Sequence, residues 1–255
     1  MKKIIKKITP TSLHNFIFRK KRLVKNMLSG VKCPICKSRF EIFKPFGLPI
    51  RKNAQCPNCQ SLERHRLLWL YLQTKERIND FKNIRILHFA PEEIFFNYFS
   101  NNNKIEYFPV DLYPEIYKYK GQSKISRADI TQIPFPQNHF DFILCNHVLE
   151  HIIDDKRAMA ELYRVMKKGG FGIFQVPIDY SRESTYEDFS ITDPSKREIE
   201  FGQYDHVRWY GKDYPERLKN AGFKVYEDEF VKTFNTKGLF KNGLMKNEII
   251  YNCKK

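Results

Sequence analysis

The stretch IRILHFAPEE, Ile84–Glu93, places a strand directly before a helix. Its first six residues, Ile84–Phe89, are mostly apolar and predict a buried strand. Pro91 suits the first position of the following helix, where no amide donor is needed. In α/β folds that bind nucleotides, glycines at this turn let backbone amides approach the ligand. This chain has no glycine between Gly47 and Gly121, so the stretch predicts either a ligand site built without glycine or no such site.

Strands and helices alternate from residue 84 onward. Seven short stretches are expected to form strands: Ile84–Phe89, Ile105–Val110, Ser123–Ser126, Phe140–Cys145, Phe171–Val176, Lys224–Phe230 and Glu248–Asn252. A helix fits Asp155–Lys167, and Gly169–Gly170 follow where a helix C-terminus is expected. The alternation predicts an α/β domain with a doubly wound, mostly parallel sheet that binds ligands at the carboxyl ends of its strands.

Polar side chains lie at or just after the ends of four of these strands. They are His88, Asp111, Asp129 and the pair Asn146–His147. Asp111 comes 21 positions after Ala90, where an acid commonly accepts hydrogen bonds from ribose hydroxyls. Asp129 is placed to accept from an exocyclic amine. Each residue alone is better explained by loop solvation or helix capping, but four strand ends in register favour a ligand site.

Five motifs together resemble a known family. They are ILHFAPE (86–92), VDLYP (110–114), ADITQIPFP (128–136), FDFILCNHVLEHIIDD (140–155) and ELYRVMKKGGFGIFQVP (161–177). This series is similar to the class I S-adenosylmethionine-dependent methyltransferases of the type 11 group, over roughly residues 84–230. The resemblance implies a seven-stranded sheet with its last strand antiparallel, and methyl transfer as the activity.

The resemblance also implies the residues that contact S-adenosylmethionine. They are His88, Ala90, Pro91, Glu92, Asp111, Leu112, Asp129, Ile130, Asn146 and His147. Family members usually carry an acid and a glycine-rich turn where this chain has residues 88–92. Ala90 keeps the turn small, and this cofactor has no pyrophosphate that demands several backbone amides. Either Glu92 or His88 then replaces the acid that holds the methionine ammonium.

The acceptor site is expected in FGQYDHVRWYGKDY, Phe201–Tyr214, within a lid or acceptor segment at residues 178–214. His206 is the candidate general base, with Asp205 and Arg208 beside it as further catalytic residues. The alternative for these three residues is a structural salt-bridge cluster that ties the segment to the sheet. His147 is expected to shape the cofactor pocket and His151 to lie on a helix surface.

Two C-x-x-C pairs mark a metal module near the N-terminus. Cys33 and Cys36 form the first pair, Cys56 and Cys59 the second, with 19 residues between the pairs. This spacing is typical of a tetrahedral structural Zn²⁺ site, which we favour over a redox pair or disulfides. Ser61 is the expected N-cap of a following helix. The expected domains are a basic arm (1–30), the zinc module (31–60), a connecting helix (61–80) and the methyltransferase domain (81–255).

The basic arm carries much of the chain's net charge of +16. The first 40 residues hold 12 of the 45 bases and none of the 29 acids, which leaves 33 bases against 29 acids in the rest. The spacing in Leu13–Leu28 suits an amphipathic helix, so residues 1–28 are expected either on an anionic membrane surface or partner, or packed on the protein's own body. No apolar run is long enough for a signal peptide or membrane span. We therefore expect a cytoplasmic protein, or one peripheral at the inner membrane surface.

Three functions remain open. The first is S-adenosylmethionine-dependent methyl transfer to a small-molecule or saccharide acceptor, with Zn²⁺ as scaffold. The second is RNA base methylation, in which the zinc module and arm bind RNA; the nearly neutral remainder of the chain argues against it. The third is a non-catalytic zinc-binding adaptor. A dehydrogenase is disfavoured because G-x-G-x-x-G is absent from the chain.

Overall fold

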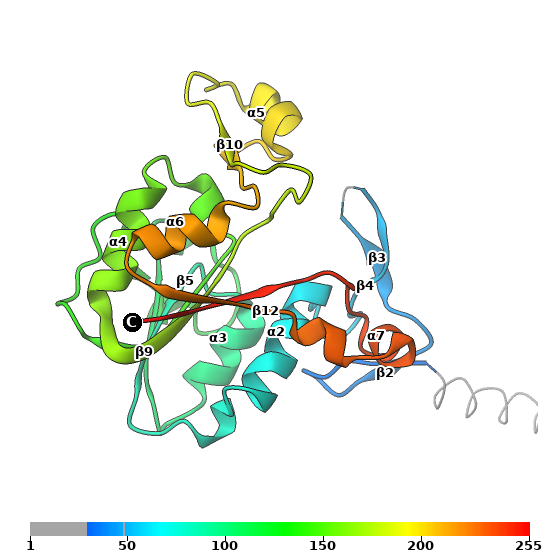
Figure 1. The fold of residues 1–255 in the computed structure, drawn as a ribbon. Helices are drawn as coiled ribbons and strands as arrows, with labels where there is room; N and C mark the ends of the chain where they lie inside the picture. Colours follow the sequence, from blue (N-terminus) through cyan, green and yellow to red (C-terminus); the bar gives the residue numbers. More distant parts are fainter. Residues whose placement is uncertain (1–29, 48) are drawn as a thin grey trace, which may run out of the picture. The chain divides into compact units, whose positions relative to one another are not determined.

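A computed structural model describes residues 30–47 and 49–255 in two compact units. The described part of the first unit comprises residues 30–76 and Val231–Glu248, and the second comprises Arg77–Phe230 and Ile249–Lys255 (Figure 1). The sequence predicted that residues 231–248 belong to the methyltransferase domain, whereas the structure groups them with the cysteine-containing unit. The predicted arm, apart from Gly30, lies outside the described residues. Every described helix is too short or too polar to traverse a lipid bilayer.

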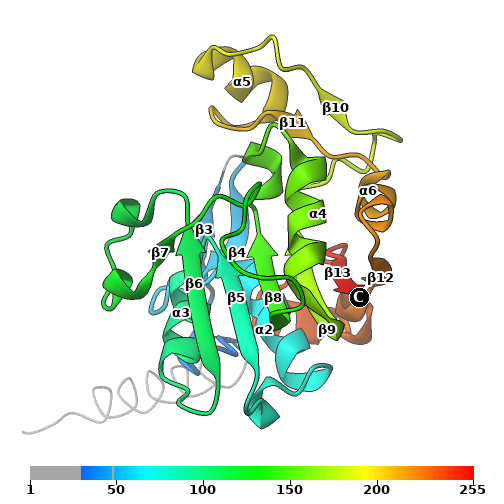
Figure 2. The same ribbon diagram turned by 90° about the vertical axis from the view of Figure 1, so that its left-hand side faces the viewer.

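The second unit is built on a seven-stranded sheet in the order β12-β13-β9-β8-β5-β6-β7. The strands are β5 (Arg85–Phe89), β6 (Glu106–Asp111), β7 (Ser126–Arg127), β8 (Phe140–Asn146), β9 (Met166–Gln175), β12 (Lys224–Asp228) and β13 (Ile250–Lys254). Strands β5 to β9 pair in parallel, and β13 is antiparallel to both β9 and β12. Figure 2 shows β6, β5 and β8 side by side at its centre. The predicted fold class, including the antiparallel last strand, is confirmed.

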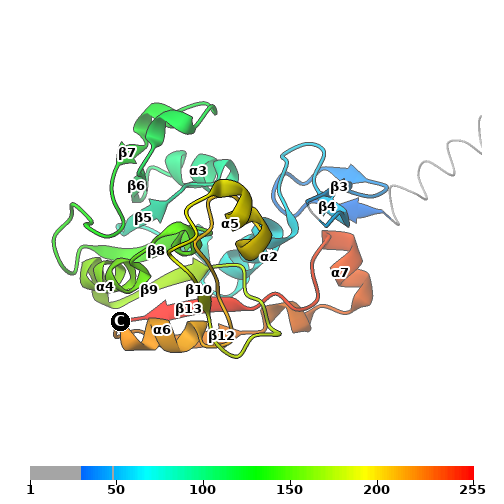
Figure 3. The ribbon, with the colours of Figure 1, turned by 90° about the horizontal axis from the view of Figure 1, so that it is seen from above.

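Helices cover both faces of this sheet. Helices α4 (Asp155–Val165) and α6 (Tyr214–Asn220) lie on one face, and α3 (Glu93–Ser100) lies on the other (Figure 3). Helix α4 begins where the Asp154 side chain accepts a hydrogen bond from the Arg157 amide at 2.9 Å. Its apolar residues recur at helical spacing and join the core of the sheet: Ala158, Met159, Leu162 and Val165.

The predicted end of helix α4 is wrong by two residues. The helix stops at Val165, and Met166 already belongs to β9. Gly169 and Gly170 therefore do not cap the helix but lie in the strand, at a bulge where the pairing of β9 with β8 shifts. Gly169 has φ of 77°, and a Cβ on Gly170 would lie 2.9 Å from the Lys167 carbonyl oxygen. Glycine suits both positions of the bulge, because another residue would be strained at position 169 and would crowd the backbone at position 170.

The predicted strand Ser123–Ser126 is mostly replaced by a turn. A short 3₁₀ helix, η3 (Gln122–Lys124), occupies the first half of that range, and β7 begins only at Ser126 as a two-residue strand. At the edge of the sheet β7 pairs with β6 alone, so little packing favours a longer strand.

The segment after β9 leaves the sheet and returns. It contains β10 (Tyr186–Glu187), α5 (Pro194–Phe201) and β11 (Arg208–Trp209), and β10 pairs with β11 in antiparallel fashion. Figure 1 draws this excursion in yellow. The 3₁₀ helices η2 (Pro114–Ile116) and η4 (Leu149–His151) follow β6 and β8.

The described part of the first unit contains two hairpins, two α-helices and most of a short 3₁₀ helix, η5 (Phe230–Thr233). Its elements are β1 (Val31–Lys32), β2 (Arg39–Phe40), β3 (Lys44–Phe46), β4 (Arg51–Gln55), α2 (Glu63–Thr74) and α7 (Thr236–Asn242). The expected N-cap Ser61 is wrong, because α2 begins after Leu62. The Ser61 hydroxyl instead lies 3.2 Å from the Cys59 sulfur, so it is used at the cysteine cluster.

Candidate functional site

A cavity of about 440 Å³ opens at the carboxyl ends of β5, β6 and β8 in the second unit. It is lined by Phe89, Ala90, Asp111, Leu112, Tyr113, Ile116, Tyr117, Ala128, Asp129, Ile130, His147, Val148, His151, Ile152 and Asp205. Seven of the predicted site residues are in this lining: Ala90, Asp111, Leu112, Asp129, Ile130, His147 and Asp205. Six are not: His88, Pro91, Glu92, Asn146, His206 and Arg208. The parallel strands thus bring most of the predicted positions to one hollow.

The turn after β5 contains no glycine, and Ala90 adopts a strained backbone conformation in its place. Ala90 has φ of 46°, in the left-handed region, and its amide donates to the Val110 carbonyl at 3.0 Å. His147, after β8, is also left-handed with φ of 53°. Such backbone conformations cost about 1–3 kcal/mol each and persist where surrounding structure enforces them, often at functional sites. Both of these strained residues, Ala90 and His147, line the same cavity.

The predicted position of Pro91 at the start of the helix is wrong. Helix α3 begins at Glu93, and Glu92 is its extended N-cap residue, so Pro91 lies one residue before the cap. The Pro91 carbonyl accepts a hydrogen bond from the Tyr119 hydroxyl at 2.6 Å. Pro91 therefore anchors the turn to the segment after β6.

Glu92 is held by a chain of buried polar groups. Its Oε2 lies 2.9 Å from Nε2 of His88, and its Oε1 accepts from the Asn146 amide at 3.2 Å. Nδ1 of His88 lies 2.8 Å from the Tyr107 hydroxyl. The His88 side chain is fully buried, whereas 18% of the Glu92 side chain is exposed. Of the two residues predicted to bind the ammonium, only Glu92 is accessible, and His88 positions it.

Asp111 ends β6 with both carboxylate oxygens oriented. Its Oδ1 accepts from the Tyr113 amide and its Oδ2 from the Tyr117 hydroxyl, each at 2.7 Å. Burial, and then the bond to Asp111, raise the pKa of Tyr117 well above its ordinary value, so Tyr117 remains a donor. Asp129 is exposed, and its Oδ1 accepts from the amide and hydroxyl of Thr131 at 2.8 Å. Sequence reasoning missed Tyr113 and Tyr117, which follow Asp111 closely in VDLYPEIY.

Exposed apolar side chains surround Asp111. Leu112 is 39% exposed, Tyr113 54% and Ile116 61%, and all three line the cavity. Such a group of large apolar side chains at a hollow marks a binding surface for a partly apolar ligand.

The predicted acceptor residues separate in the structure. Asp205 lines the cavity, and its carboxylate lies 3.4 Å from Nδ1 of His151. His206 lies behind this pair, 7% exposed, with its ring 4.7 Å from that of His151. His151 was predicted on a helix surface; that prediction is wrong, because η4 turns it into the cavity lining.

Arg208 lies fully buried, away from the cavity lining. It donates to the Glu187 carboxylate at 2.9 Å and to the carbonyls of Leu149, Ile152 and Ile153. Burial lowers the pKa of Arg208, but Tyr210, Asp155 and Glu187 outweigh it, and the net direction is upward. These contacts match the structural alternative predicted for Arg208, which ties the excursion to η4.

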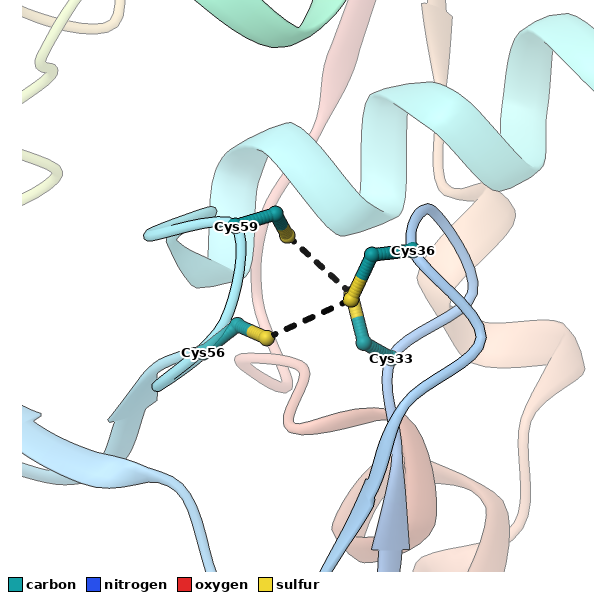
Figure 4. A group of neighbouring side chains, drawn as sticks. All are labelled: Cys33, Cys36, Cys56 and Cys59. Atoms are coloured by element: carbon teal, nitrogen blue, oxygen red, sulfur yellow. Dashed lines mark hydrogen bonds between the residues drawn. The ribbon is translucent and has the colours of Figure 1, made fainter.

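In the first unit, the four predicted cysteines converge from two loops (Figure 4). The sulfurs of Cys33 and Cys59 are 3.6 Å apart, and those of Cys36 and Cys56 are 3.7 Å apart. A tetrahedral Zn²⁺ with 2.3 Å bonds needs sulfurs about 3.8 Å apart. The hydrogen bond with Cys59 and burial raise the pKa of Cys33 to about 12, which favours the protonated thiol. A bound cation favours the thiolate instead. The cluster fits a closed four-sulfur metal site.

The sheet order and helical layers are those of the class I methyltransferase fold. Residues 92–174, which run from the N-cap residue of α3 to the next-to-last residue of β9, match the family model described as a methyltransferase domain. The matched stretch contains Asp111, Asp129 and His147 of the cavity lining.

Similar proteins cover part of the chain. The ubiquinone/menaquinone biosynthesis C-methyltransferase UbiE of Psychromonas ingrahamii is 36% identical over 72 residues, which are 27% of this chain and 28% of that protein. The protein of the same name from Francisella tularensis is 32% identical over 74 residues, 28% of this chain and 30% of its own length. The chain thus spans less than a third of these curated relatives.

Solved structures were also found. An S-adenosylmethionine-dependent methyltransferase from Mesorhizobium loti is 15% identical, covering 74% of this chain and 98% of its own, with a TM-score of 0.48. A Burkholderia thailandensis 1,6-didemethyltoxoflavin-N1-methyltransferase is 12% identical, covering 76% and 77%, with a TM-score of 0.46.

Proposed function

We propose that this protein is an S-adenosylmethionine-dependent methyltransferase whose cofactor binds in the cavity at the ends of β5, β6 and β8. The observation that carries the proposal is the position of Asp111. Its oriented carboxylate lines a small-molecule-sized hollow within the stretch that matches the methyltransferase domain.

Each part of the cofactor has a matching group. Asp111 accepts from the ribose hydroxyls, and Asp129 is placed to accept from the adenine amine. Leu112 and Ile130 supply apolar surface for the adenine ring. Glu92 does not itself line the cavity, but it follows Ala90 of the lining by two residues, is partly exposed and is held by His88 and Asn146, so we assign it as the anion for the methionine ammonium. S-adenosylmethionine supplies a methyl group already activated on a sulfonium sulfur.

The protein's remaining task is to align the acceptor and exclude water. Asp205, His147 and His151 are polar side chains of the cavity lining that the cofactor assignment does not use. They suit a small acceptor with hydroxyl groups, such as a saccharide. Because His206 lies behind His151, we assign contact with the acceptor to Asp205 and His151, and a supporting position to His206.

We further propose that the four cysteines bind a structural Zn²⁺. Cys33, Cys36, Cys56 and Cys59 would occupy all four positions of a tetrahedral ion, which leaves none open for chemistry. The support is the match of the sulfur distances to that geometry.

Calorimetric titration with S-adenosylmethionine tests the cofactor site. Asp111→Asn removes the charge but keeps the side-chain size, and we expect affinity to fall at least ~10-fold, as for the loss of a charged hydrogen bond. Asp228→Asn is the matched control, because Asp228 ends β12 at the opposite edge of the sheet and should leave affinity unchanged. Wild-type affinity in Asp111→Asn would contradict the assignment, and no binding by the wild type would favour the adaptor function.

The acceptor class is tested by incubating the wild type and labelled cofactor separately with cellular RNA and with a small-molecule extract. Label in the small-molecule fraction supports the proposed acceptor. Label in RNA would support base methylation, a function whose predicted basic arm lies mostly outside the described residues.

A further inference from the structure

Three potential metal ligands meet beside the cavity. Glu150 and His151 come from η4, and His206 comes from the returning end of the excursion. One ligand atom from each lies within 4.8 Å of those of the other two. Glu150 is 1% exposed and His206 is 7% exposed, while His151 lines the cavity. The group is therefore buried on one side and open to the cavity on the other.

The Glu150 carboxylate is only half satisfied. Its Oε1 lies 3.3 Å from Nδ1 of His147. Its Oε2 is buried and has no hydrogen-bond partner among the described residues. A buried carboxylate oxygen left without a partner is costly, and native proteins normally satisfy such atoms.

Both histidines are held through the same ring nitrogen. Nδ1 of His206 lies 3.1 Å from the Phe201 carbonyl oxygen. Nδ1 of His151 lies 3.3 Å from the Asp205 carbonyl oxygen and 3.4 Å from its carboxylate. Since carbonyl and carboxylate oxygens accept, Nδ1 of each ring donates to them, which leaves Nε2 as the ring nitrogen available to a metal ion. Metal-binding histidines are oriented in this way by carbonyl and carboxylate partners.

An acid–base relay or a structural cluster explains this arrangement less well. The two imidazole rings meet edge-on, with an interplanar angle of 81°, and both have Nδ1 occupied by other partners. A purely structural cluster leaves the Glu150 oxygen unsatisfied. Two neutral imidazoles and one carboxylate are instead a donor set for Zn²⁺ or Fe²⁺, whereas Ca²⁺ and Mg²⁺ prefer oxygen donors throughout.

We infer that Glu150, His151 and His206 form a binding site for a divalent transition-metal ion on the wall of the cavity. The site is separate from the four-cysteine cluster, which lies in the other unit. Three protein ligands leave at least one coordination position open, as in catalytic metal sites.

The role of this ion rests on the proposed methyl transfer. An ion held by His151 would lie beside the expected acceptor and would lower the pKa of an acceptor hydroxyl. The hydroxyl proton would pass to water, and the oxygen would attack the methyl carbon. The carbon–oxygen bond would form as the carbon–sulfur bond breaks, with the bonding electron pair left on sulfur. The acceptor class is thus a molecule with a metal-binding hydroxyl group.

Cobalt binding tests the site. Protein carrying one Zn²⁺ per chain on its cysteines is titrated with Co²⁺, followed by its visible absorption. We expect one further Co²⁺ per chain, without the thiolate charge-transfer band that binding at cysteines gives. Glu150→Gln and His206→Asn should each lower the Co²⁺ affinity at least ~10-fold, since even outer-shell changes have this effect. His139→Asn, a half-buried histidine elsewhere in the same unit, should bind like the wild type.

The inference is overturned if the wild type binds no Co²⁺ beyond the cysteines, or if both ligand variants bind it like the wild type. Thermal unfolding shows whether each variant is folded, and His151→Gln replaces any variant that is not. Failure of the proposed function looks different. Cobalt binding that depends on Glu150, without S-adenosylmethionine binding, keeps the metal site and rejects the methyltransferase. Cofactor binding without cobalt binding keeps the methyltransferase and rejects the metal site.

Discussion

Each unit contains a fully buried arginine, and the two are neutralised differently. In the first unit, Arg66 donates to the carbonyls of Ala54, Ser61, Asn242 and Gly243. In the second unit, Arg208 donates to three carbonyls and to the Glu187 carboxylate, with Asp155 3.9 Å away. Both side chains are fully buried. The described hydrogen bonds of Arg66 reach neutral oxygens only, whereas Arg208 has carboxylates of its own.

The difference indicates that the positive charge of Arg66 is balanced by groups other than its hydrogen-bond acceptors. Burial lowers the pKa of Arg66, opposed first by the charge of Cys33 and then by Glu63, Cys56 and Cys59. Four thiolates around the proposed Zn²⁺ would carry a net charge of −2, and together with Glu63 they would supply the counter-charge for Arg66. The first unit should therefore depend on its metal, while the second unit carries its charge balance in its own side chains.

The largest effect is expected from Cys56→Ser. Loss of one thiolate weakens Zn²⁺ binding and removes part of the charge that stabilises Arg66, so the first unit should lose its fold. Limited proteolysis with mass spectrometry should show cleavage within residues 30–76 and 231–248, with β5 to β9 still protected. Cys253→Ala removes a buried thiol from β13 and should leave the first unit intact. A wild-type cleavage pattern in Cys56→Ser would show that the metal is not what holds this unit together.

Arg208→Met should destabilise the second unit by about 3–5 kcal/mol, the cost of breaking a buried ion pair from one side. Within residues 30–47 and 49–255, Glu187 and Asp155 would keep only Arg217 as a cationic partner. Urea unfolding, followed by a signal from the second unit, measures the loss in free energy of unfolding. Arg197→Met is the control: Arg197 lies in the same excursion and donates to the Ile191 carbonyl, so we expect a loss of about 1 kcal/mol. Equal losses in the two variants would remove the contrast drawn for Arg208.

The smallest effect, about 1 kcal/mol, is expected from Glu161→Gln. The Glu161 carboxylate accepts from Arg164 at 2.7 Å and from the Ile133 amide at 2.9 Å, and the bond with Arg164 leads the effects that lower its pKa. A lowered folded pKa contributes stability that is full above the ordinary value of 4.5 and is lost as the pH falls through the folded pKa.

Urea unfolding of wild type and Glu161→Gln at pH 7 and at about pH 3 checks this prediction. The difference in free energy of unfolding should shrink at the lower pH, because the wild-type carboxyl also becomes protonated. A difference that grows on acidification would reverse the sign of the assigned shift. In the first unit, acid should act through the thiolates instead, because protons compete with the metal for sulfur.

Local patterns were sufficient for the framework of both units. Apolar stretches bounded by polar strand ends predicted the sheet, and the cysteine spacing predicted the convergence of four sulfurs. The same patterns failed where a residue's partner is distant in sequence. The glycines after α4 resembled a helix cap, but β8 and Lys255 decide that they form a bulge. Arg208 resembled a catalytic residue until its partners in η4 and β10 were known.

The sequence by itself therefore determined the class of fold, the strand ends that carry Asp111, Asp129 and His147, and the four-cysteine cluster. Periodicity and short spacings encode these features directly. Only the tertiary structure decided that His151 faces the cavity and meets Asp205, 54 residues later in the chain. The physical reason is that Glu150, His151 and His206 come together only when the excursion packs against η4. That packing depends on buried contacts between residues far apart in the sequence, and no local sequence pattern encodes them.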